Sequence, residues 1–219
     1  GAHAIYVTTV DSLGNPGDTS ATITFTIDTV APVAVTDLAA ANNNGGAPVA
    51  ITNNGITNDS TPQLSGTTEA NGIVTIYDGN TVVGSTTASG TGVWTFISPT
   101  LSQGAHTLSV TVTDAAGNVG PRSSAVNFTV DSIAPNATTL VVTNDANGNT
   151  VVPNNSATND TTPTLSGTAE ANGRVSVYDG TTLLGTAIAS ATGAWTFTST
   201  ALTQGSHTLN VTVTDAAGN

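Results

Sequence analysis

The chain repeats itself at a spacing of 101 to 103 residues. Residues 59–118 return as residues 160–219, with about two-thirds of the positions identical. The unit is also visible further upstream, because Asp11 precedes Asp114 by 103 residues and Asp28 precedes Asp131 by the same distance. An internal period of domain length is the signature of a tandem array, so we expect one globular unit to recur along the chain.

Short alternating runs indicate that the repeated unit is all-β. Residues 107–113 alternate polar and apolar side chains with period two, and turns rich in Gly and Asn separate this run from similar ones. Strands at such spacing, with no helical periodicity, predict an antiparallel β-sandwich. In the middle unit we expect strands over residues 33–40, 47–51, 63–68, 73–77, 81–86, 93–98, 105–114 and 123–130.

The repeat divides the chain into three parts. Residues 1–31 carry the last two strands of a first unit, residues 32–134 form a complete unit, and residues 135–219 lack the last strand of a third. An incomplete sandwich exposes a sheet edge. We therefore expect either a window of a longer array or a neighbouring copy that supplies the missing strand.

Charge and composition exclude several classes of function. The net charge is −12, Lys and Cys are absent, and Arg122 and Arg174 are the only Lys or Arg residues. Two cations cannot form a phosphate-binding surface, so we expect no nucleic-acid partner. The absence of an apolar run near 18 residues predicts that this segment does not insert into a membrane. Without Cys no disulfide can form.

The sequence contains no recognisable catalytic constellation, so we predict that the protein is not an enzyme. His3, His106 and His207 recur at one strand start, with no nucleophile and orienting group placed beside them. We interpret them as turn or packing residues. Trp94 and Trp195 lie in alternating strand runs, which favours core packing over sugar stacking.

The acidic residues follow the repeat. Eleven of the fourteen fall on five columns, whereas neighbouring Ser and Thr positions differ between the copies. This pattern favours a use for the carboxylates, although duplication alone copies any residue. The columns are Asp11/Asp114/Asp215, Asp28/Asp131, Asp59/Asp160, Glu69/Glu170 and Asp78/Asp179.

Sandwich topology places most of these acids in two groups. The turn before the third strand and the hairpin before the last strand lie at the end that faces the preceding linker. Two junction clusters follow, Asp28 with Glu69 and Asp114, and Asp131 with Glu170 and Asp215. Carboxylate and carbonyl oxygens suit Ca²⁺, so we predict calcium there, with Asp11 as a further member of the column. No thiolate or dense His cluster is present to favour zinc or copper.

A second pair of acids belongs to the opposite end of each sandwich. Asp59 with Asp78, and Asp160 with Asp179, are predicted to form a second metal site there. An equally supported alternative is local, because Asp in such turns often accepts hydrogen bonds from nearby backbone N–H groups.

Several motifs together resemble a known family. They are the linker VDSIAP with its counterpart TVAP after Asp28, the opening ND-T-TP-LSG-T-EANG, the YDG turn and the TVTDAAGN hairpin. Over essentially the whole chain they resemble the bacterial immunoglobulin-like repeats of giant, type I-secreted adhesins and biofilm-associated proteins. The resemblance implies tandem Ig-like sandwiches joined by short Asp-x-x-Ala-Pro linkers. It also implies a non-enzymatic role at an extracellular bacterial surface, with calcium stiffening the joints.

Two functional hypotheses remain open. The repeats are spacers of an adhesin or biofilm matrix fibre, with like repeats as their neighbours and host or matrix glycans bound by other domains. Alternatively, the repeats themselves bind glycan or self-associate, by strand exchange or homophilic contact. Near-identity between consecutive units favours the spacer, because recognition sites usually lie on divergent loops.

Overall fold

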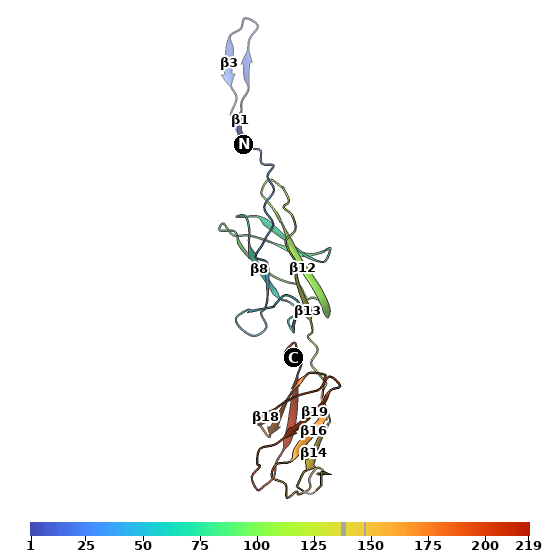
Figure 1. Ribbon diagram of the computed structural model, residues 1–219. Coiled ribbons are helices and arrows are strands. Elements are labelled where there is room, and N and C mark those ends of the chain that lie inside the picture. Colours follow the sequence, from blue (N-terminus) through green and yellow to red (C-terminus); the bar gives the residue numbers. More distant parts are fainter. Residues whose placement is uncertain (137–138, 147) are drawn as a thin grey trace. The chain divides into compact units, whose positions relative to one another are not determined.

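The computed structural model describes residues 1–136, 139–146 and 148–219. Every helix or strand assigned within these ranges is a β-strand, which confirms the all-β prediction (Figure 1). Accordingly, the described residues contain no helix long and apolar enough to cross a membrane. By internal contacts the chain separates into two compact units. One comprises Gly1–Asn54, Thr61–Thr100 and His106–Asn127, and the other comprises Gly55–Ser60, Leu101–Ala105 and Phe128–Asn219. The division at residues 32 and 135 stays a prediction.

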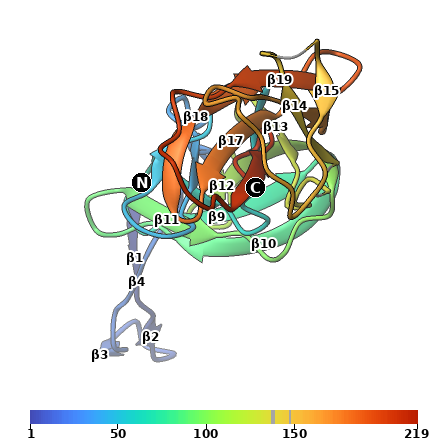
Figure 2. The ribbon, with the colours of Figure 1, turned by 90° about the horizontal axis from the view of Figure 1, so that it is seen from below.

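The N-terminal segment is a narrow ribbon of two strand pairs (Figure 2). Strand β1 (Ala2–Ile5) pairs antiparallel with β4 (Ile23–Thr26), and β2 (Thr8–Val10) pairs with β3 (Pro16–Thr19). Phe25 and Ile27 are exposed here, whereas Phe128 and Val130, 103 residues downstream, are buried. The ribbon therefore exposes apolar side chains at positions whose equivalents in the middle unit are buried in the core.

The middle unit, meaning the predicted repeat of residues 32–134, contains two sheets. Their strand orders are β10-β9-β12-β13-β7 and β11-β8-β5-β6. Their strands are β5 (Ala39–Asn42), β6 (Val49–Ala50), β7 (Gly55–Thr57), β8 (Gln63–Thr67), β9 (Ile73–Asp78), β10 (Thr81–Thr87), β11 (Val93–Ile97), β12 (Gly104–Thr113) and β13 (Val126–Val130). Alternate residues on these strands are buried because strand side chains point to opposite faces. Leu64, Val74, Ile76, Leu108 and Val110 are fully buried.

Two parts of the strand prediction for this unit are wrong. The strand expected over residues 33–40 begins only at Ala39. Before it, the Asp37 carboxylate accepts bonds from Thr67 N (3.0 Å) and Thr67 Oγ1 (2.7 Å), so a side chain takes the place of a ladder bond. Strand β7 was not expected, and it pairs parallel with β13, an exception to the antiparallel pattern. The other predicted strands are present, with ends shifted by three residues or fewer.

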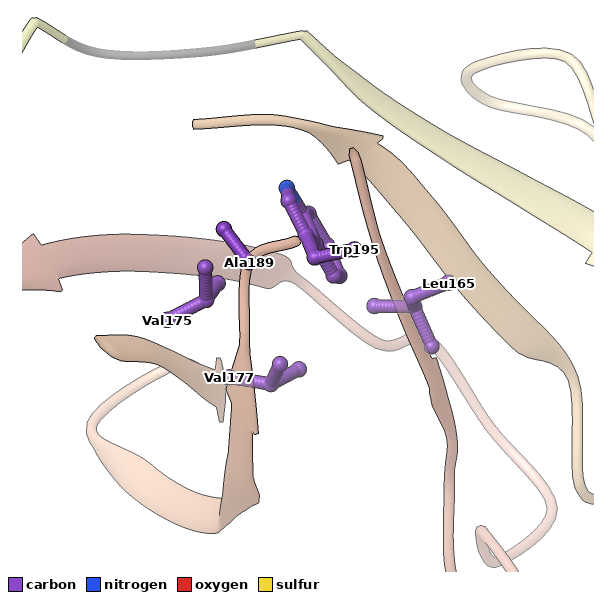
Figure 3. Packing of buried hydrophobic residues seen from close by; sticks show 5 residues of the cluster. All are labelled: Leu165, Val175, Val177, Ala189 and Trp195. Carbon is purple, nitrogen blue, oxygen red and sulfur yellow. The ribbon is translucent and has the colours of Figure 1, made fainter. Parts of the chain in front are cut away.

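The C-terminal unit repeats this plan. Its sheets have the orders β15-β14-β16-β19 and β18-β17-β20. The strands are β14 (Leu140–Asn144), β15 (Thr150–Val151), β16 (Thr164–Thr168), β17 (Arg174–Asp179), β18 (Thr182–Ile188), β19 (Ala194–Thr198) and β20 (Leu209–Thr214). Figure 3 shows the centre of its core, where side chains from both sheets and one connection meet: Leu165, Val175, Val177, Ala189 and Trp195.

Candidate functional site

A short acidic loop recurs at three places with the same internal hydrogen bonds. We call it the Asp-x-x-Gly-Asn loop; it spans residues 11–15, 114–118 and 215–219. In the second copy, Asp114 Oδ1 accepts from Ala116 N (2.9 Å) and Asn118 N (2.8 Å), and Asp114 Oδ2 accepts from Asn118 Nδ2 (2.8 Å). The loop therefore closes on its own carboxylate.

These hydrogen bonds stabilise the ionised form of the carboxylate. The bond from the Asn118 side chain, and then those from the backbone N–H groups, hold the pKa of Asp114 below its ordinary value, against the effect of burial. Burial raises the pKa of Asp215, but the bonds from Asn219, Gly218 and Ala217 outweigh it and lower that pKa. The ionised carboxylates of Asp114 and Asp215 thus stabilise the fold fully above about pH 3.8. This contribution is lost as pH falls through their folded-state pKa values.

The same Asn side chains contact the linkers that precede their domains. Asn118 Nδ2 donates to the carbonyl oxygen of Asp28 at 3.1 Å. In the C-terminal unit, Asn219 Nδ2 donates to the carbonyl oxygen of Asp131 at 2.7 Å. The backbone of each linker Asp therefore lies at an Asp-x-x-Gly-Asn loop.

Strand register places the turns of Glu69 and Glu170 at the same end of the sheet as the Asp-x-x-Gly-Asn loops. Ile73, which follows the turn of Glu69, pairs with Thr113, directly before Asp114. In the C-terminal unit Arg174 pairs with Thr214 in the same way, which places the turn of Glu170 beside the loop of Asp215. Each junction cluster thus has a turn, a loop and a linker at one end.

The chemistry of these residues fits a hard cation, because carboxylate and carbonyl oxygens are the donors. Their side chains nevertheless do not gather into one cage. Within the described ranges, no three His, Asp or Glu side chains lie close enough to hold a metal ion between them. A calcium ion at a junction would therefore take linker carbonyls or water among its ligands, and calcium binding stays a prediction.

At the opposite end, the predicted acids are used for local structure. Asp160 Oδ1 accepts from Thr162 N (2.9 Å), and Asp160 Oδ2 accepts from Asp145 N (2.7 Å). Its counterpart Asp59 is 0 % exposed, and its backbone N–H donates to Thr57 Oγ1 (3.1 Å). This geometry favours the local alternative over a second metal site for this column.

Asp78 and Asp179 each pair with a histidine, which the sequence interpretation missed. Asp78 Oδ2 lies 2.6 Å from His106 Nδ1, and Asp179 Oδ2 lies 2.7 Å from His207 Nδ1. The other oxygen of each carboxylate accepts from the N–H of the residue after the histidine. A signal was present, since both pairs are separated by 28 residues.

The contacts of His207 require both ring nitrogens to donate. Nδ1 faces Asp179 Oδ2, and Nε2 faces the carbonyl oxygen of Thr203 at 2.8 Å. Two acceptors favour the imidazolium. The bond to Thr203, and then the bond to Asp179, raise the pKa of His207 above 6.5, while His207 lowers the pKa of Asp179.

We expect an NMR titration of the His207 ring to give a midpoint above 6.5. Because the pKa of His207 is raised in the folded state, its contacts with Thr203 and Asp179 stabilise the fold fully below about pH 6.5. That contribution is lost as pH rises through the folded-state pKa. Asp179→Asn should move the midpoint down, whereas the control Asp18→Asn should not. A midpoint at or below 6.5 in the unaltered protein would contradict the assignment.

The two tryptophans lie in the core, as the sequence predicts. Trp94 is 2 % exposed and Trp195 is 3 % exposed. Because their ring faces are covered by protein, neither offers a platform on which a sugar could stack.

The linker after the middle unit is also held by a glutamine. Gln103 Nε2 donates to Ser132 Oγ (2.5 Å), and Ser132 N donates to Gln103 Oε1 (3.2 Å). Asp131 N donates to the carbonyl oxygen of Thr57 at 2.9 Å. Two successive linker residues are therefore fixed by backbone and amide groups.

Comparison with known proteins adds a family match. A family model described as "Bacterial Ig-like domain" matches residues 30–132 and 135–219, in agreement with the predicted tandem immunoglobulin-like repeats. No curated protein gives a significant match.

Two solved structures are similar at 16 % sequence identity. The fibronectin(III)-like modules of Clostridium thermocellum CbhA align over 82 % of this chain and 87 % of theirs, with a TM-score of 0.46. A biofilm-associated protein BSP domain aligns over 75 % of this chain with a TM-score of 0.27, and the chain spans 26 % of that structure.

Proposed function

Because this chain belongs to the bacterial Ig-like domain family, we propose that it is a non-enzymatic structural repeat of an extracellular bacterial adhesin or biofilm fibre. In this role the units act as a spacer, and calcium stiffens the linkers between them. The observation that carries the proposal is the repeated junction: in two copies, a carboxylate loop reaches the carbonyl of the preceding linker.

A spacer requires units that fold independently and linkers that resist bending. The middle and C-terminal units each have a buried core, and three of the five acidic columns, those of Asp28, Glu69 and Asp114, belong to the linker end of a unit. Two carboxylates about 5 Å apart repel by roughly 3 kcal/mol at an effective dielectric of about 20. A bound divalent cation would remove that repulsion, with the carboxylates of Glu69 and Asp114 and the linker residue Asp28 as the ligands of the first junction. Glu170, Asp215 and Asp131 would hold it at the second.

Calorimetric titration with calcium tests this proposal. We expect binding with a dissociation constant of about 10⁻⁴ to 10⁻³ M, the range of extracellular calcium modules. The double variant Glu69→Gln/Glu170→Gln keeps side-chain size and removes one charge per junction, so it should bind at least tenfold more weakly. Asp18→Asn, which alters an acid outside the five columns, is the matched control. Absence of binding at millimolar calcium would refute the calcium part of the proposal.

A further inference from the structure

The Asn that ends the second and the third Asp-x-x-Gly-Asn loop uses both hydrogens of its side-chain amide. Asn118 Nδ2 donates one to Asp114 Oδ2 at 2.8 Å and the other to the carbonyl oxygen of Asp28 at 3.1 Å. An amide nitrogen carries two donors and a hydroxyl carries one, so Asn is suited to join a carboxylate to a carbonyl. The side chain thus connects the loop to the linker.

The arrangement occurs twice with equivalent partners. Asn219 Nδ2 donates to Asp215 Oδ2 at 2.8 Å and to the carbonyl oxygen of Asp131 at 2.7 Å. The remaining copy supplies a comparison, because Asn15 Nδ2 donates to Asp11 Oδ2 at 2.8 Å. Among the described residues, the side chain of Asn15 bonds to Asp11 alone. The bond that closes the loop on its carboxylate is thus common to all three copies.

The loop that carries Asn118 is itself rigidly held. Asp114 N donates to the carbonyl oxygen of Asn118 at 3.1 Å, and Gly117 N donates to the carbonyl oxygen of Asp114 at 3.2 Å. Asp114 is 6 % exposed, and it directly follows β12, a strand in the centre of its sheet. A linker carbonyl bonded to Asn118 is consequently tied to the sheet rather than to a mobile turn.

We propose that Asn118 and Asn219 are metal-independent latches that hold residues Asp28 and Asp131 of the preceding linkers against their domains. The latch goes beyond the proposed function, because both of its hydrogen bonds form within the protein and need no calcium. The ionised carboxylate strengthens the bond that orients the amide, since hydrogen bonds to charged acceptors are stronger than neutral ones. Calcium, where it binds, acts on a linker whose first residue is already placed.

Backbone ¹⁵N relaxation of the full chain in excess chelator tests the latch. In the unaltered protein we expect order parameters near 0.85 at residues 28–29 and 131–132, the value of rigid backbone. In Asn118→Ala the order parameters at residues 28–29 should fall below about 0.6, the range of flexible backbone, while those at 131–132 stay unchanged. Asn118→Asp keeps the side-chain size and removes both donors, so it should have the same effect.

Asn15→Ala is the matched control, because it removes the same loop-closing bond in another copy, away from residues 28–29, and should leave those residues ordered. Order parameters along β12 show whether each variant is folded. Disorder at residues 28–29 in the unaltered protein, or unchanged order there in both Asn118 variants, would overturn the latch. The calcium proposal is tested separately, because it fails if the calorimetric titration detects no binding, whatever the relaxation data show.

Discussion

Leu165→Ala is expected to lower the free energy of unfolding of the C-terminal unit by about 2–5 kcal/mol, as for other buried Leu→Ala substitutions. Leu165 is 0 % exposed and packs in the cluster with Val175, Val177 and Trp195 (Figure 3). Removing its side chain leaves a cavity between the two sheets, because neighbouring strands are fixed by their ladders. Urea unfolding followed by fluorescence should show a lower midpoint with an unchanged slope.

Leu183→Ala is the matched control for this prediction. Leu183 is 52 % exposed on strand β18, so the same chemical change removes little buried surface. We expect its effect to stay within about 0.5 kcal/mol, as for other surface substitutions. Equal losses in both variants would show that Leu165 does not occupy the core position described above.

Gly92→Ala is expected to lower the free energy of unfolding by about 2–5 kcal/mol, the sum of a left-handed backbone penalty and overpacking. Gly92 has a φ of +82°, and a Cβ atom there would lie 2.1 Å from the carbonyl oxygen of Thr68. That backbone cannot move away easily, because Thr68 N donates to the carbonyl oxygen of Gly92 at 2.9 Å. Thermal unfolding measures the loss.

Gly90 lies two residues earlier in the same turn and provides the control. Apart from its two chain neighbours, no residue would have a heavy atom within 4 Å of a Cβ atom at Gly90, and its φ lies outside the left-handed region. Gly90→Ala should therefore change the free energy of unfolding by no more than about 0.5 kcal/mol. A loss in Gly90→Ala as large as that in Gly92→Ala would contradict the steric explanation.

Much of the fold could be predicted because period-two alternation is strong in strands such as β9 and β12. The failures occur where backbone hydrogen bonding is not encoded by alternation. Strand β7 has three residues, too few for a pattern, and it forms because its backbone pairs with β13. Residues 33–38 look like a strand, yet the Asp37 carboxylate takes a bond that a ladder would use.

The candidate site could be predicted in part for a related reason. The repeat locates Asp114 and Asp215, and topology places the turns of Glu69 and Glu170 at the same end of the sheet. The sequence indicates turns rich in Gly and Asn, but it gives no sign that the side chain of Asn118 contacts a linker carbonyl. Whether the amide of a loop Asn can donate to a linker carbonyl depends on the path of the linker. Local sequence patterns do not encode that path.

The proposed role as a spacer rests on the bacterial Ig-like units, on the acidic loops that recur at the linkers and on the amides that contact those linkers. Small-angle X-ray scattering of residues 1–219, titrated with calcium and then with chelator, tests this claim most directly. We predict that calcium narrows the distribution of chain dimensions, that chelator reverses the change, and that Glu69→Gln/Glu170→Gln does not respond. A scattering profile that is the same with and without millimolar calcium would contradict calcium-dependent stiffening of the spacer.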